Sequence, residues 1–126
     1  ISTMGNATDF GNVSVARRFL GGFESSTRGV FAGGSTPSAS NVIDYITMAT
    51  TGNATDFGDL SQARETNGAS NSVRGISAAG RTPTLVNTID FVTIASTGNA
   101  TDFGDTTIAR RSGSTECNGH GGLVGG

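Results

Sequence analysis

The stretch Gly5-Asn6-Ala7-Thr8-Asp9-Phe10-Gly11 returns without change at 52–58 and again at 98–104, so that its copies begin 47 and then 46 residues apart. A period of this length is typical of arrays in which each unit is a small supersecondary element. Such a unit buries its apolar face only against its neighbours. The sequence therefore predicts a repeat protein, and favours a scaffold over a catalyst.

The repeat extends well beyond this heptapeptide. Residues 28–55 align with 74–101 at a constant offset of 46 without a gap, which pairs Pro37 with Pro83. We interpret the whole chain, 1–126, as one repeat array. Because its ends do not coincide with the ends of a unit, we expect an excerpt of a longer array that needs flanking sequence or another copy for stability. The expected units are 5–51, 52–97 and a partial unit at 98–126.

Composition and charge restrict the class of protein. Hydrophobic residues make up 34% of the chain and there are twenty Gly, which fits short strands joined by tight turns. All eight basic residues are Arg and are outnumbered by ten acidic ones, so no broad basic field exists to hold a nucleic acid. No apolar stretch is long enough to predict a membrane span.

Period-two patterning predicts four strands in each repeat. In one unit they cover 29–34, 41–48, 54–62 and 66–72, and we expect them to form one antiparallel sheet, with the small-residue strand at 29–34 innermost. Four short strands in 46 or 47 residues are the anatomy of a propeller blade. The aromatic residue of each heptapeptide is its only large apolar side chain, so we expect burial between adjacent sheets for Phe10, Phe57 and Phe103.

The order of these features resembles the kelch repeat. Gly33-Gly34, Tyr45, Phe57 and Arg64 stand where that repeat carries its consensus residues, although Phe replaces the usual third-strand Trp and Ala79 breaks the second Gly-Gly doublet. The resemblance implies an all-β, kelch-like β-propeller segment of four-stranded antiparallel blades. It also implies that the recurrent Arg ties one blade to its neighbour through carbonyls or carboxylates such as Asp44.

The amino-acid sequence of the repeat is also similar to repeats in large virion-associated proteins of marine bacteriophages, particularly those of cyanobacteria. The similarity is clearest over residues 41–64. This resemblance implies a structural and adhesive module of a virion appendage, such as a fibre or tail-associated protein. Its partners would be other virion proteins, additional copies of itself, or a host surface glycan or protein. The alternatives are a cytoplasmic kelch-type protein-binding module and a fragment of a propeller enzyme. One Tyr, one His and one Cys supply no catalytic set, and no cofactor is expected.

The repeats differ most in three stretches, 18–24, 65–68 and 111–114, which we interpret as loops. Binding residues are disproportionately placed on loops that a rigid scaffold positions. We therefore predict a binding surface that includes Arg18, Phe19, Glu24, Glu65, Asn67 and Arg111.

Three further patterns in the sequence are similar to known chemical sites. Recurrent acids in the heptapeptide could serve calcium, but two acids in each loop are few, and an Asx-type turn is favoured. The Asn-Ala-Thr triplets match the N-glycosylation acceptor, yet their recurrence within a turn signature indicates backbone geometry. Cys117 and His120 form half of a zinc site at best, so no metal is predicted. The acids concerned are Asp9, Asp56, Asp59, Asp102 and Asp105, and the glycosylation triplets begin at Asn6, Asn53 and Asn99.

Overall fold

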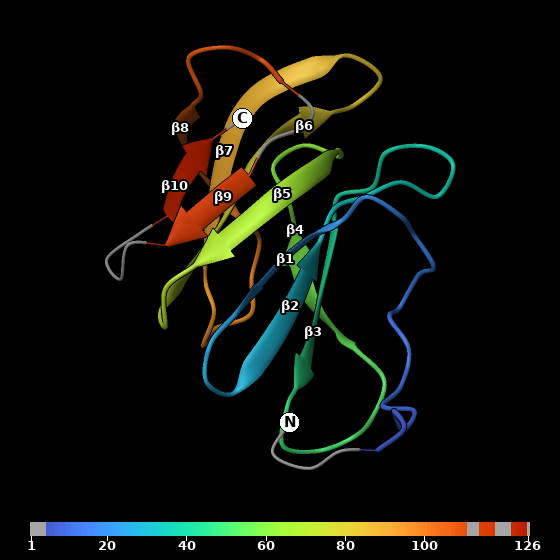
Figure 1. Cartoon of the computed structure of the whole chain (residues 1–126). Coiled ribbons are helices and arrows are strands. Elements are labelled where there is room, and N and C mark those ends of the chain that lie inside the picture. The colour runs from blue at the N-terminus through green and yellow to red at the C-terminus, as the bar shows by residue number, and fades with distance from the viewer. Residues whose placement is uncertain (1–4, 111–113, 118–121, 126) are drawn as a thin grey trace.

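The computed structural model describes residues 5–110, 114–117 and 122–125, and every regular element in these ranges is a β-strand. The strands form two four-stranded antiparallel sheets and one two-stranded hairpin (Figure 1). The all-β antiparallel class is thereby confirmed. Within these ranges there is no helix with the length and hydropathy needed to cross a bilayer. The strands are β1 (Gly21–Glu24), β2 (Arg28–Ala32), β3 (Val42–Thr47), β4 (Thr55–Asp59), β5 (Glu65–Ser70), β6 (Arg74–Arg81), β7 (Leu85–Thr93), β8 (Thr101–Asp105), β9 (Ser114–Cys117) and β10 (Gly122–Gly125).

The two large sheets are built alike, in the orders β1-β2-β3-β4 and β5-β6-β7-β8. Val30 pairs with Tyr45 in the first sheet, and Ile76 pairs with Phe91, each 46 residues further on, in the second. Both sheets also shift register at the same point, next to Asp44 and its counterpart Asp90. Residues that are 46 positions apart in the sequence therefore pair with equivalent partners in the two sheets, because the same side chains meet across the strands.

The prediction that 66–72 shares a sheet with 29–34, 41–48 and 54–62 is wrong. That segment is β5, the first strand of the second sheet, and the first sheet is instead completed by β1, which lies in a stretch interpreted as a loop. The pattern of a strand indicates which of its faces is buried but not which neighbour it pairs with. The unit at 52–97 consequently spans parts of two sheets, with β4 in the first and β5, β6 and β7 in the second.

The strand expected to be innermost, the small-residue strand at 29–34, is not the one that lies closest to the other sheet. Where the sheets approach each other, the main contact is between β1 and β5, with a smaller one between β1 and the small-residue strand β6. The Ser70 hydroxyl accepts from the Glu24 amide at 3.0 Å and donates to the Glu24 carbonyl at 2.9 Å. Gly68 fits against Gly22, where a side chain would meet the Gly22 carbonyl. Figure 1 shows β9 following on beside β5, although the described strands do not close a ring.

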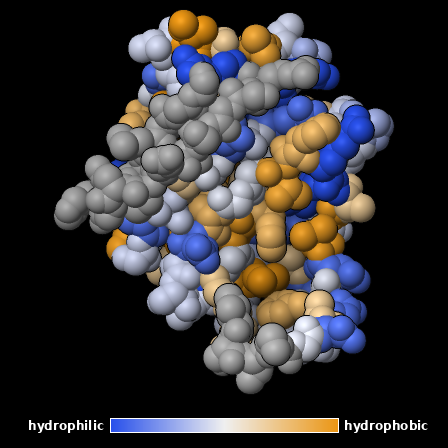
Figure 2. Space-filling view, in the orientation of Figure 1, coloured by the Kyte–Doolittle hydropathy of each residue, from blue (hydrophilic) through white to orange (hydrophobic). Residues whose placement is uncertain are grey.

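The hydrophobic core lies between the two sheets. Ile43 and Phe57 of the first sheet pack in one cluster with Val92 of the second and with Ile94, which follows β7, and all four side chains are buried. Figure 2 shows that some apolar side chains also reach the surface on the face over β1 and β2. Because the cluster draws on both sheets, neither sheet has a complete core of its own.

The predicted burial of the three heptapeptide aromatics is confirmed only for Phe57. Its side chain is 2% exposed and meets Tyr45 edge to face, with ring centroids 5.9 Å apart. Phe10 is half-buried, and Phe103 is 57% exposed although it keeps the equivalent contact with Phe91. The second sheet covers Phe57, whereas the described residues place no third four-stranded sheet over Phe103.

Candidate functional site

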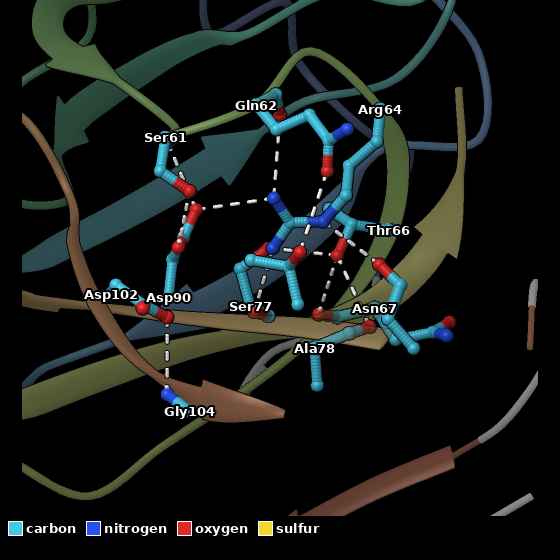
Figure 3. A network of polar contacts seen from close by, with 12 residues as sticks. Ser61, Gln62, Arg64, Thr66, Asn67, Ser77, Ala78, Asp90, Asp102 and Gly104 are labelled. Atoms are coloured by element: carbon cyan, nitrogen blue, oxygen red, sulfur yellow. Dashed lines mark hydrogen bonds and ion pairs between the residues drawn. The ribbon is translucent and has the colours of Figure 1, made fainter. Parts of the chain in front are cut away.

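Arg64 forms the first of two kinds of joint, and this one lies within a repeat unit, between a connecting loop and the sheet that follows it. It lies in the loop that leaves β4 and enters β5, and its side chain is fully buried. The guanidinium pairs with Asp90 of β7, with Nη1 and Oδ2 3.1 Å apart, and donates to the carbonyls of Ser77 and Ala79 on β6 at 2.9 and 2.8 Å (Figure 3). Ser61 donates to the same carboxylate. The connecting loop is thus fastened to the second sheet.

The same arrangement occurs one repeat earlier. Arg17 pairs with Asp44 at 3.1 Å and donates to the carbonyls of Phe31 and Gly33, while Ser14 donates to the carboxylate. Both ion pairs are completely buried, and no buried side-chain nitrogen or oxygen in the described residues lacks a hydrogen-bond partner. The predicted contact of the recurrent Arg with carbonyls and with Asp44 is confirmed. These guanidinium groups have no solvent-exposed surface with which to bind a ligand.

The second kind of joint is made by the heptapeptide, and we call it the heptapeptide joint. Gly98 N–H donates to the carbonyl of Phe57 at 2.7 Å, and Ala100 N–H donates to the carbonyl of Asp59 at 2.8 Å. In return, Asp59 N–H donates to the side-chain Oδ1 of Asn99 at 3.0 Å. Three hydrogen bonds therefore join one copy of the heptapeptide region to the next.

The preceding heptapeptide joint has the same three bonds. Gly52 donates to the Phe10 carbonyl and Ala54 to the Asn12 carbonyl, both at 2.8 Å, while Asn12 N–H donates to Asn53 Oδ1 at 3.1 Å. The position held by Asn12 in one joint is held by Asp59 in the other, and only its backbone takes part. The invariant Asn is thus explained by a side-chain contact between units, to which the Gly and the Ala contribute their backbone N–H groups.

The last glycine of the heptapeptide makes this close approach possible. Gly58 has φ +153, and a Cβ built on it would collide with the carbonyl of Gly98. Gly52, the first glycine of the same copy, would meet nothing within 4 Å. The requirement for glycine therefore differs between the two ends of one motif.

We expect Gly58→Ala to lower the free energy of unfolding by about 1–3 kcal/mol, because the added methyl group meets backbone and the residue is held at positive φ. Gly52→Ala, in the same copy, should change it by less than about 0.5 kcal/mol. Urea unfolding of both variants measures the difference. Equal effects would show that the joint does not depend on the close approach.

The heptapeptide acids serve turns at two of the three copies. Asp9 Oδ1 accepts from Gly11 N–H, and Asp102 Oδ1 accepts from Gly104 N–H, each at 3.2 Å. This is the predicted Asx-type turn. In the described part of the chain no group of three or more His, Cys, Asp or Glu side chains is placed to hold a metal ion. The Cys117 side chain and His120 lie outside what the structure describes.

Two of the predicted binding residues meet in a cleft of about 560 Å³, which we call the loop-end cleft. Arg18 and Glu65 line it together with Arg81, which sequence analysis did not single out. Arg81 is the register partner of Glu65 at the end of β6. The remaining lining residues are Ser35, Pro37, Ser38, Ala39, Ala63, Thr82 and Pro83.

The other predicted binding residues are dispersed. Phe19 is 63% exposed beside Arg18, whose guanidinium lies 5.2 Å from its ring centre. Glu24 lines a separate groove of about 460 Å³ between β1, β2 and β5, and Asn67 is half-buried in β5. Arg111 is outside the described residues. The repeated prolines in the loops before β3 and β7 are the sequence signal that could have indicated the loop-end cleft.

Comparison with known proteins finds no family model and no curated protein that matches this sequence. The chemistry of the loop-end cleft is therefore the guide to function. Two guanidinium groups, one carboxylate and several hydroxyls give donors and acceptors for a polar ligand, and the proline rings give apolar contact.

Proposed function

We propose that this chain is a structural and adhesive repeat module whose sheets are blades of a kelch-like propeller and whose loop-end cleft binds a polar surface ligand. One observation carries the proposal: buried Arg–Asp pairs fasten the connecting loops to the sheets, while the sequence-variable Arg18 remains exposed in a cleft between two units. Constant residues thus serve the scaffold and variable residues serve the ligand.

The propeller assignment has two supports. The first strands of the two sheets, β1 and β5, lie side by side, and β9 follows in the same position relative to β5. The order of strands from first to fourth repeats in each sheet, which is how a blade is wound. Successive blades would place their loop-end clefts on one face of the assembly.

The setting that we propose is a bacteriophage virion appendage, as the resemblance of the repeat implies. There the scaffold would contact other virion proteins and the cleft would contact a host surface glycan or protein. Arg18 and Arg81 outnumber the one carboxylate of the cleft, Glu65, which favours a ligand with carboxylate or sulfate groups. Acidic surface polysaccharides have this chemistry.

The test is binding of the fluorescently labelled chain to intact cyanobacterial cells and to a panel of acidic and neutral oligosaccharides. Arg18→Ala should weaken binding about tenfold, the equivalent of one charge-assisted hydrogen bond. Arg74→Ala is the matched control, because Arg74 is also exposed and also lies over a Phe ring, but at the opposite end of β6 from Arg81. Loss of binding in both variants, or in neither, would contradict a role for the loop-end cleft.

A further inference from the structure

The third heptapeptide presents one half of a joint. We infer that the outer edge of β8, at Phe103–Asp105, is a docking site for the Gly5–Ala7 segment of a second copy of this chain, so that copies associate head to tail. The two heptapeptide joints within the chain supply the geometry of this contact.

The receiving half is already in the right conformation. Gly104 has φ +152, against +149 for Gly11 and +153 for Gly58, the two equivalent residues that lie in joints. A Cβ on either of those would collide with the carbonyl of the next heptapeptide. On Gly104 it would meet nothing within 4 Å in the described structure, and the adjacent Phe103 is 57% exposed. None of the described residues fills the space at Gly104 that the next unit fills at Gly11 and Gly58.

The inserting half is accessible at the other end of the chain. Gly5, Asn6 and Ala7 are all exposed, and they are identical to the residues at 52–54 and 98–100 that insert in the two internal joints. One copy of the chain therefore carries both complementary halves.

The contact between two copies would have the same hydrogen bonds as the two heptapeptide joints within the chain. Gly5 N–H would donate to the carbonyl of Phe103 in the second copy, and Ala7 N–H to that of Asp105, while Asp105 N–H would donate to Asn6 Oδ1. The Asp at 105 is acceptable because position 59, which is also Asp, uses only backbone atoms in its joint. An extended segment added to an open sheet edge is a familiar mode of recognition. Because the two halves are different surfaces, the assembly would be a chain or a ring of copies, not a two-fold dimer.

Two proline variants test the contact in the full chain. Ala7→Pro removes the donor of the inserting half within an exposed, irregular segment. Asp105→Pro removes the outward N–H of the receiving half on an edge strand, a place where proline is tolerated. Circular dichroism confirms that each variant remains folded. Each alone should raise the dissociation constant for self-association at least about tenfold in sedimentation equilibrium.

A mixture of the two proline variants gives the decisive result. A chain with Ala7→Pro retains its receiving half and a chain with Asp105→Pro retains its inserting half, so the mixture should form a 1:1 heterodimer that grows no further. The milder Asn6→Ala should weaken self-association about fivefold. Asn41→Ala, the same change at another exposed residue, should leave it unaltered. The inference is overturned if the unmodified chain stays monomeric at its highest soluble concentration, if both proline variants associate as it does, or if the mixture forms no heterodimer.

Discussion

Replacing Arg64 with Met is expected to lower the free energy of unfolding by about 3–5 kcal/mol, the usual effect of removing one partner from a buried ion pair. Asp90 would keep its charge in a fully buried site and lose its cationic partner, retaining only the bonds from Ser61. The carbonyls of Ser77 and Ala79 would each lose a donor. Urea unfolding monitored by circular dichroism measures the change.

Arg74→Met is the control for this prediction. Arg74 is exposed, and its guanidinium lies 4.5 Å from the centre of the Phe91 ring, so its loss should cost no more than about 1 kcal/mol. The double variant Arg64→Met with Asp90→Leu should recover part of the stability, because it removes both buried charges. If Arg64→Met were as mild as the control, Arg64 would not fasten the connecting loop to the second sheet.

Replacing Phe57 with Ala should cost about 3–5 kcal/mol, as expected for deletion of a fully buried aromatic side chain. The ring is 2% exposed and packs in the cluster between the two sheets, so the substitution leaves a cavity where the sheets meet. The matched substitution, Phe103→Ala, changes the same residue of an identical heptapeptide. Because that ring is 57% exposed, its loss should cost less than about 1 kcal/mol.

Thermal and urea unfolding measure the free energy of unfolding of these two variants. They compare a buried and an exposed Phe that stand in the same heptapeptide sequence. A large loss for Phe57→Ala beside a small loss for Phe103→Ala would confirm that burial between sheets stabilises the protein. Similar losses would mean that the heptapeptide aromatic acts within its own sheet, through the edge-to-face contact with Tyr45 or Phe91.

Much of the candidate site followed from the repeat. Residues that recur in every unit must serve something that every unit has, so Arg17 and Arg64 were expected to make structural contacts with carbonyls and carboxylates, and both do. Arg18 and Glu65 were predicted from their variability and meet in the loop-end cleft. Arg81 was not found, because it carries no local pattern and reaches the cleft only through its pairing opposite Glu65.

The sequence by itself determined the repeat, its offset of 46 and the antiparallel all-β class, because equal residues at equal spacing form equal local structure. Only the tertiary structure decided that β5 begins the second sheet, since a strand's side-chain pattern does not encode its neighbour. It also decided which aromatic is buried. Phe57 and Phe103 have identical flanking residues, but among the described strands only those around Phe57 have a second four-stranded sheet against them, and burial depends on what the fold brings into contact.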